Sequence, residues 1–155
     1  MVTILVCILS LLFTTDSLAG TIDPNTPDIK YIEYGKDFHC IGKVLGKMKN
    51  GLDFNASGVA IEPHFILTAA HVVEEADNCF FMIKDKKIPI TKIVYHTNFN
   101  VDKVAKSDIA LGYCEEDFGL DFYPELYSVN DEVGKICSIS GYGFTGTFIT
   151  GANIY

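Results

Sequence analysis

The sequence contains no arginine, and this absence limits the partners that the protein can have. Its 155 residues carry 12 basic side chains, all of them lysine, against 20 Asp and Glu, for a formal net charge of −8. Binding to nucleic acid needs a basic face that neutralises phosphates, and arginine supplies the bidentate fork that grips them. The composition therefore argues against nucleic acid as a partner. The acidic surplus is typical of a soluble surface.

The sequence also has no C-x-x-C pair. That spacing is the usual signature of zinc knuckles and of dithiol redox motifs, so neither is expected. A metal site built from His64 and His71 would need ligands on either side of a turn, without a fitting carboxylate. We therefore predict no metal and no cofactor.

No hydrophobic run is long enough to cross a bilayer. The apolar segment Ile4–Phe13 has ten residues, of which only Ser10 is polar, whereas a spanning helix needs about 20. Its length fits the core of a signal peptide, and Ser17 and Ala19 are the small residues that a signal peptidase reads. We predict a signal peptide over 1–19, a mature chain from Gly20, secretion (extracellular or periplasmic) and no membrane contact after cleavage. The first three residues lack Lys and Arg, which leaves two alternatives: an uncleaved anchor or a mispredicted start codon.

Removal of this segment leaves four of the five cysteines: Cys40, Cys79, Cys114 and Cys137. An even number of cysteines in a secreted chain of this size predicts disulfide bonds. Four cysteines allow three pairings, and the sequence leaves the choice among them open.

No segment keeps a helical period over any length, and short apolar runs alternate with turns instead. Asn50-Gly51 is a strong hairpin signal, and Pro63 fits the following turn. This rhythm predicts an all-β barrel or sandwich. We expect six strands before a charged linker, over residues 38–45, 57–61, 65–69, 79–83, 88–96 and 108–114. A helical turn is expected over 70–77, and further strands over 134–140 and 145–154.

Three short motifs follow one another along the chain. Phe65–Val73 reads FILTAAHVV and places His71 after a strand, Ser107–Leu111 reads SDIAL, and Cys137–Gly143 reads CSISGYG. Taken together in this order, they resemble the trypsin/chymotrypsin-like serine protease family. The order of His before Asp is that of chymotrypsin, whereas subtilisin-like enzymes place Asp first and α/β-hydrolases place Ser first.

The resemblance implies a fold, an activity and two catalytic residues. His71 would be the general base, and Asp108 the carboxylate that orients its imidazole and stabilises the protonated form. The fold would be a chymotrypsin-like Greek-key β-barrel over about 30–117, followed by a linker over 118–132 and the start of a second barrel over 133–155. The substrate would be a protein or peptide. The histidines outside these motifs are predicted to be structural: His39, His64 and His96.

The nucleophilic serine of the family has no counterpart in this sequence. No serine has the Gly-Asp-Ser-Gly-Gly context in which backbone N–H groups form an oxyanion hole. The formal candidates Ser57, Ser138 and Ser140 do not fit. We therefore expect residues 20–155 to be a trypsin-like peptidase domain that is incomplete at its C-terminus and inactive alone. The alternative is a non-catalytic secreted binding module, or a decayed protease homologue, on the same fold.

Two further expectations concern single positions. Animal trypsins carry Cys directly after the catalytic His, where this chain has Val72. A Cys40–Cys79 bridge is a candidate substitute, because strands one and four can be neighbours in such a barrel. Asn55-Ala56-Ser57 is a formal N-glycosylation acceptor, but it abuts a predicted core strand, so we expect it to be poorly accessible.

Overall fold

The computed structural model describes residues 23, 25–100, 106–142, 147–149 and 152–154. The chain divides into two units, residues 31–143 and residues 1–30 together with 144–155. The predicted signal peptide lies outside the described residues. Within the described ranges, no helix is long and apolar enough to span a membrane.

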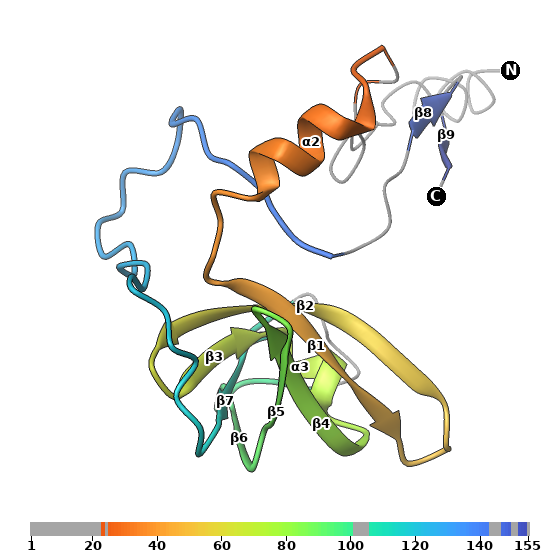
Figure 1. The fold of residues 1–155 in the computed structure, drawn as a ribbon, viewed down its shortest axis with the longest axis vertical. Helices are drawn as coiled ribbons and strands as arrows, with labels where there is room; N and C mark the ends of the chain where they lie inside the picture. Colours follow the sequence, from red (N-terminus) through yellow and green to blue (C-terminus); the bar gives the residue numbers. More distant parts are fainter. Residues whose placement is uncertain (1–22, 24, 101–105, 143–146, 150–151, 155) are drawn as a thin grey trace, which may run out of the picture. The chain divides into compact units, whose positions relative to one another are not determined.

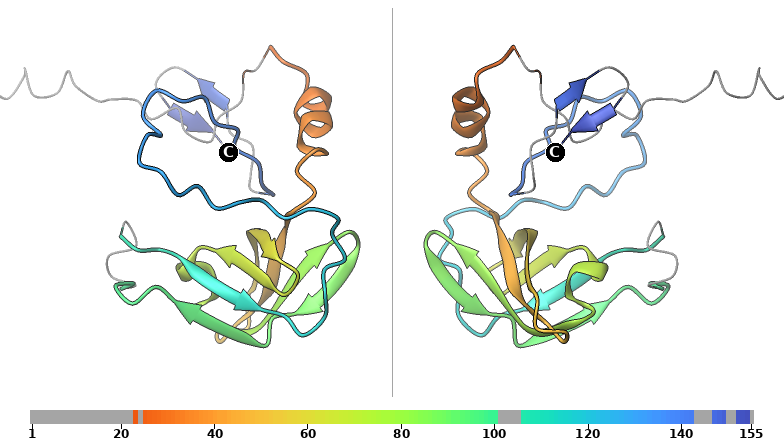
Figure 2. Two further views of the ribbon diagram at one scale, coloured as in Figure 1. Left: turned by 90° about the vertical axis from the view of Figure 1, so that its left-hand side faces the viewer. Right: turned by 90° about the vertical axis from the view of Figure 1, so that its right-hand side faces the viewer.

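The larger unit is built on one antiparallel sheet of seven strands (Figure 1). Figure 2 shows that this sheet is strongly curled rather than flat, so that its concave face encloses a core. The prediction of an all-β fold is confirmed. In sheet order, the strands are β5 (Lys86–Pro89), β4 (Ala76–Ile83), β1 (Ile41–Met48), β2 (Asp53–Glu62), β3 (Phe65–Thr68), β7 (Ala110–Tyr113) and β6 (Lys92–Tyr95).

The two edge strands of this sheet, β5 and β6, follow one another in the chain. The two residues that connect them, Ile90 and Thr91, form hydrogen bonds to both sides of the sheet. The Ile90 N–H donates to the Cys79 carbonyl at 2.9 Å, and the Thr91 N–H donates to the Tyr113 carbonyl at 2.8 Å. Because the chain passes here from β5 to β6, the single strand predicted over 88–96 is two strands. The arrangement also leaves fewer unpaired ladder groups to template aggregation.

The predicted turn at Asn50-Gly51 joins β1 to β2. Gly51 has φ +85°, a conformation that side chains with a Cβ rarely adopt, and the Asn50 side chain accepts a hydrogen bond from the Leu52 N–H at 3.0 Å. The two strands pair from Ile41 opposite Val59 down to this turn. β2 therefore begins at Asp53, four residues before the predicted start of that strand.

The core lies inside the curled sheet. Phe81 and Phe118 are fully buried, with ring centroids 5.2 Å apart in an edge-to-face arrangement. Gly42 makes room for them, since a Cβ there would lie 2.6 Å from the Phe81 ring. The remaining buried apolar residues come from most of the strands, α3 and the segment after β7: Val44, Ala60, Ile66, Ala70, Val73, Cys79, Ile83, Ile88, Ala110 and Cys114.

Some predicted elements differ from the structure. A helix, α2 (Asp28–Gly35), was not predicted, and it buries none of its residues. The helical turn expected over 70–77 is shorter, α3 (Ala70–Val73), because β4 begins at Ala76. Residues 134–140 form no strand, since they pair with neither sheet. The strand expected over 145–154 is instead an antiparallel hairpin of β8 (Thr147–Ile149) and β9 (Ala152–Ile154).

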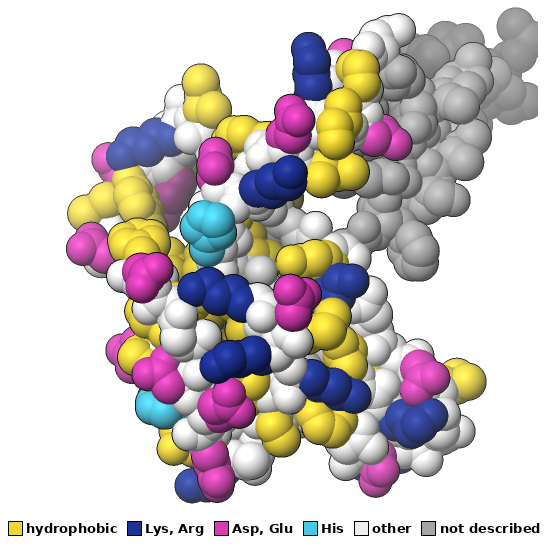
Figure 3. Space-filling model, viewed as in Figure 1, with side chains coloured by type: hydrophobic (Ala, Val, Ile, Leu, Met, Phe, Trp, Pro, Cys, Tyr) yellow, Lys and Arg dark blue, Asp and Glu magenta, His cyan; other side chains and the backbone are white. Residues whose placement is uncertain are grey.

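Lysines on the face of the molecule shown in Figure 3 lie among acidic side chains. Two ion pairs lie on the surface: Lys47 of β1 is 2.9 Å from Asp53 of β2, and Lys49, just after β1, is 3.3 Å from Glu75, just before β4. All four side chains are more than half exposed, so each pair contributes no more than about 1 kcal/mol to stability.

Candidate active site

The register between β3 and β7 brings the two predicted site residues together. Thr68, the last residue of β3, pairs with Ala110, the first residue of β7. His71 follows Thr68 by one turn, and Asp108 precedes Ala110 by two residues. Antiparallel pairing places the end of one strand beside the start of the other. Two residues 37 positions apart in sequence therefore meet at one end of the sheet.

His71 is held by a short helix that is anchored on its inner side. Ala69 is extended, with φ −73° and ψ 138°, and α3 begins directly after it. Ala70 is fully buried and Val73 nearly so, which fixes the helix against the core. The small residues before His71 let its backbone approach neighbouring segments closely. The imidazole side chain itself is half exposed.

Asp108 lies in a tight turn before β7. Ser107 has φ +59°, in the left-handed region, and the Ile109 N–H donates to the Ser107 carbonyl at 2.8 Å. The turn thus closes around Asp108 and directs its carboxylate to α3. A non-glycine residue at positive φ is uncommon and costs roughly 1–2 kcal/mol, which the surrounding contacts must offset.

Both carboxylate oxygens of Asp108 accept hydrogen bonds from His71. Oδ1 lies 2.9 Å from the backbone nitrogen of His71, and Oδ2 lies 2.6 Å from Nδ1 of the imidazole. Desolvation raises the pKa of Asp108, but the bonds from the His71 N–H, the His71 ring and the Ala70 N–H outweigh it, so the net shift is downward. Asp108 is therefore ionised at neutral pH and can only accept.

This protonation state fixes the tautomer of the imidazole. An ionised carboxylate has no proton to give, so the proton in the 2.6 Å contact belongs to Nδ1 of His71. Nε2 of the neutral ring then carries a lone pair and can accept a proton. The arrangement can take a proton from a hydroxyl group and stabilise the resulting imidazolium through Asp108.

Two of the three serines that the sequence offers as formal nucleophiles have other hydrogen-bond partners. Ser57 Oγ accepts a hydrogen bond from the Tyr142 N–H at 2.8 Å, and the Ser138 hydroxyl bonds to the Tyr34 hydroxyl. Ser140 lines a cavity of about 180 Å³ beside Ser57. Among the described residues, no serine hydroxyl bonds to His71.

The third motif therefore contacts the first barrel through Ser57. Besides the bond from Tyr142, a Cβ on Gly141 would lie 2.7 Å from Ser57 Oγ, so only glycine fits there without a shift. Lys43 Nζ lies 5.0 Å from the centre of the Tyr142 ring. Sequence reasoning did not foresee this contact, because nothing in CSISGYG indicates its partner.

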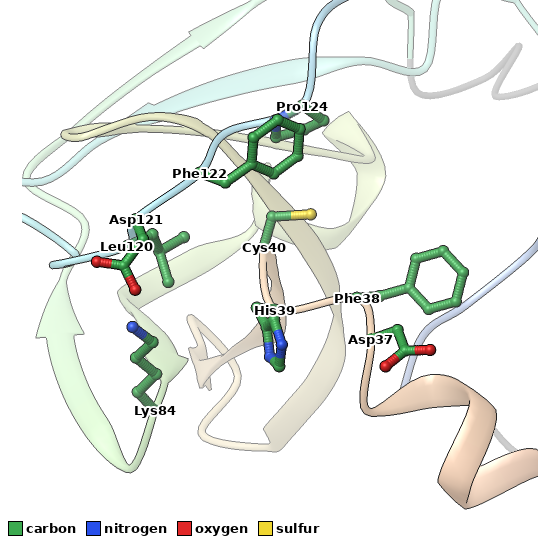
Figure 4. Close-up of a pocket in the computed structure, with 9 residues that line it drawn as sticks. All are labelled: Asp37, Phe38, His39, Cys40, Lys84, Leu120, Asp121, Phe122 and Pro124. Atoms are coloured by element: carbon green, nitrogen blue, oxygen red, sulfur yellow. The ribbon is translucent and has the colours of Figure 1, made fainter.

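Two of the other histidines are placed by backbone contacts. His64 Nδ1 lies 3.1 Å from the Cys114 carbonyl, and His96 Nδ1 accepts from the Asn98 N–H at 3.2 Å. His39 lines a separate cavity of about 570 Å³, which is also lined by residues 37, 38, 40, 84, 120–122 and 124 (Figure 4). Neither His71 nor Asp108 lines this cavity. No group of three metal-binding side chains occurs in the part of the chain that the structure describes.

The proposed Cys40–Cys79 bridge is wrong. β1 and β4 are neighbours, as expected, but their register pairs Cys79 with Gly46. Cys40 precedes Ile41 at the other end of β1, about 20 Å away along the strand at 3.3 Å per residue. All four described cysteines are free: Cys40, Cys79, Cys114 and Cys137.

Comparison with known proteins finds solved structures that resemble this chain. A solved structure titled GrC has a TM-score of 0.53 and 15% identity, with 66% of this chain and 48% of that chain covered. The active form of the Rv3671c protease from M. tuberculosis has a TM-score of 0.49 and 18% identity, with 71% and 43% covered. HL collagenase has a TM-score of 0.47 and 22% identity, with 51% and 37% covered. This chain thus spans less than half the length of these proteins, and no curated protein sequence matches it.

The curled antiparallel barrel has the chymotrypsin-like fold of serine proteases. The family model Trypsin matches residues 36–151, which is most of the chain. The protein belongs to the trypsin family.

Proposed function

We propose that this chain is the N-terminal part of a secreted trypsin-like serine endopeptidase. His71 is its general base, and Asp108 orients and stabilises that base. The observation that carries the proposal is the paired contact of one ionised carboxylate with both the backbone N–H and Nδ1 of His71. The substrate is a protein or peptide, as is general for the family.

In this proposal, Nε2 of His71 takes the proton of a serine hydroxyl as that oxygen attacks the carbonyl carbon of the scissile bond. The same nitrogen later returns the proton to the leaving amine. Asp108 stays ionised throughout and stabilises the imidazolium. The serine, its oxyanion hole and the specificity pocket would come from polypeptide that the 155 residues do not contain.

The exposure of apolar side chains after the linker supports this incompleteness. Val133, Ile136 and Ile139 are 86–101% exposed, although residues of this kind are normally buried. Soluble proteins rarely leave many such side chains in water unless another surface covers them. A second barrel completed by further strands would cover them.

The test begins with the coding sequence beyond Tyr155. A continuing frame with Gly-Asp-Ser-Gly-Gly supports a protease. A longer chain should then hydrolyse peptide and ester substrates, and His71→Ala should abolish turnover, whereas His39→Ala should not. His39 is exposed and lies apart from the dyad, so it is a matched control.

The second candidate is a non-catalytic secreted binding module or a decayed protease homologue on the same fold. The lack of a suitable serine in the 155 residues favours it. A stop codon after Tyr155 would support it. The chain should then hydrolyse no ester or peptide substrate above solvent background, and turnover that His71→Ala abolishes would contradict this candidate.

Secretion is part of the proposal and has its own test. Export should remove residues 1–19, so the mature protein should begin at Gly20. N-terminal sequencing of the exported protein measures this directly. A mature protein that still begins at Met1 would contradict the signal peptide and favour the uncleaved anchor.

A further inference from the structure

Asn55 lies on the outer face of β2. Successive side chains of a strand point to opposite faces, and burial along β2 alternates in this way. Asp53 and Asn55 are exposed, whereas Phe54 and Ala56 are partly buried. The expectation that Asn55 would be poorly accessible is therefore wrong, because the strand begins earlier than the sequence indicated.

The surroundings of Asn55 are open on one side. Asn55 pairs with Leu45 of β1, but the pairing of β2 with β3 begins only at Val59. Figure 1 shows β2 running well past the end of β3. The Asn55 carboxamide makes no hydrogen bond to any other described residue, so a group attached to Nδ2 would break no contact seen in the structure.

We propose that Asn55 is an N-glycosylation site. The acceptor requires Asn-x-Ser with any residue but Pro in the middle, and Asn55-Ala56-Ser57 is the only such tripeptide in the sequence. The proposal rests on the proposed secretion, since the donor is a lipid-pyrophosphate-linked oligosaccharide of the secretory pathway. Nδ2 of Asn55 forms a bond to C1 of the first sugar as the C1–O bond to the lipid pyrophosphate breaks. One proton leaves Nδ2, and the lipid pyrophosphate departs with the electron pair.

Transfer precedes folding at this site. In the folded chain, Ser57 Oγ already accepts the Tyr142 N–H at 2.8 Å, and Gly141 packs against it. The serine hydroxyl that the acceptor needs is therefore free only while the chain is still extended. Folding afterwards closes residues 141–142 over Ser57 without disturbing Asn55, which lies two residues earlier in β2 and pairs with Leu45.

A glycan at Asn55 would cover partly buried apolar side chains. Asn55 pairs with Leu45, and Leu45 pairs in turn with Phe80 of β4, so these three residues form one row across the outer face of the sheet. Leu45 and Phe80 are only partly buried in the described unit. The glycan would shield this row from other proteins.

The experiment is translation of the full chain in a cell-free system supplied with endoplasmic-reticulum microsomes. We expect one mass shift that a peptide N-glycosidase removes. Asn55→Gln should abolish it, Ser57→Thr should retain it, and the control Asn98→Gln should leave it unchanged. Peptide mapping after deglycosylation should show Asp at position 55.

The same samples distinguish a failure of the glycosylation proposal from a failure of the secretion proposal. A chain that is cleaved before Gly20 and protected from added protease, yet shows no glycosidase-sensitive shift, would overturn the glycosylation proposal alone. A chain that is neither cleaved nor protected would overturn both. A shift that persists in Asn55→Gln would also overturn the assignment, because it would place the glycan elsewhere.

Discussion

Replacing Asp108 with Asn should switch the tautomer of His71. Asp108 offers two acceptor oxygens, one to the His71 backbone N–H at 2.9 Å and one to Nδ1 at 2.6 Å. Asn has the same shape but only one acceptor oxygen, and its other terminal group donates. If that oxygen keeps the contact with the His71 backbone N–H, the NH₂ group of the Asn carboxamide faces Nδ1. The ring must then carry its proton on Nε2, and this nitrogen can no longer accept a proton from a serine hydroxyl.

The size of the effect follows from the bond that is lost. Hydrogen bonds to charged groups contribute about 1.5–3 kcal/mol. The His71 side chain is 50% exposed, so solvent screening favours the lower end of that range, about 1.5 kcal/mol. Since about 1.4 kcal/mol corresponds to a factor of ten, the Nδ1–H tautomer should fall about tenfold relative to Nε2–H.

Long-range proton–nitrogen correlation spectra of protein with ¹⁵N-labelled histidine measure this ratio. The spectra are recorded over a pH series, and the ratio is taken from the signals of the neutral ring. We expect Nδ1–H in the unmodified protein and Nε2–H in Asp108→Asn. Asp121→Asn removes an exposed carboxylate away from the dyad and should change nothing. If Asp108→Asn kept the Nδ1–H form, the argument that Asp108 sets the tautomer would be refuted.

Three other predictions concern the hydrophobic core, the loss of stability at acid pH and the reactivity of the thiols. Phe81→Ala should lower the free energy of unfolding by about 3–5 kcal/mol, because it opens a cavity in a fully buried site. The control Phe122→Ala, at a side chain that is 71% exposed, should change it by less than about 0.5 kcal/mol. Urea titration followed by circular dichroism measures both values. The pKa of Asp108 is lowered on folding from its ordinary value of 3.8, so its contribution to stability is present above that pH and is lost as the pH falls through the lower folded value. Acid titration should therefore cost the unmodified protein more stability than it costs Asp108→Asn, and parallel curves would contradict this. Burial raises the pKa of Cys79 to about 12, so alkylation near neutral pH should label the exposed Cys137 before Cys79. Equal labelling rates of the two thiols in the folded protein would contradict the burial of Cys79.

The part of the site that depends on local pattern could be predicted from sequence. The run Phe65–Thr68 is short, mostly apolar and preceded by the Pro63 turn, which indicates a strand without knowledge of its partners; in the structure, Ile66 and Thr68 are its buried residues. His71 then follows a strand end, and Asp108 precedes the next barrel strand. Nothing in the sequence states that Thr68 pairs with Ala110, yet that register is what brings the two side chains into contact.

The predictions that failed concern features that depend on which residues are buried or on the register between strands. α2 has only eight residues and buries none of them, so its apolar residues Ile29 and Ile32 do not mark a face packed on the core. The Cys40–Cys79 bridge failed because adjacent strands can pair in several registers, and the one adopted separates the two cysteines. The accessibility of Asn55 was misjudged because a strand start misplaced by a few residues hid the alternation that turns Asn55 outward.

Asp108 has a structural role that would persist even in a homologue without a nucleophile. α3 has no side-chain cap at Ala69, and Asp108 accepts the N–H group of His71, the second residue of the helix, instead. Asp108→Ala would remove the acceptor of both the His71 N–H and the His71 ring, at about 1.5 kcal/mol for each of these bonds to a charged group, or about 3 kcal/mol together. His71→Ala removes only the ring contact and leaves Asp108 on the backbone, so it should cost about 1.5 kcal/mol, roughly half the loss in Asp108→Ala. Urea titration should show this asymmetry with or without proteolytic activity. Equal losses in the two variants would contradict it and assign Asp108 to the imidazole alone.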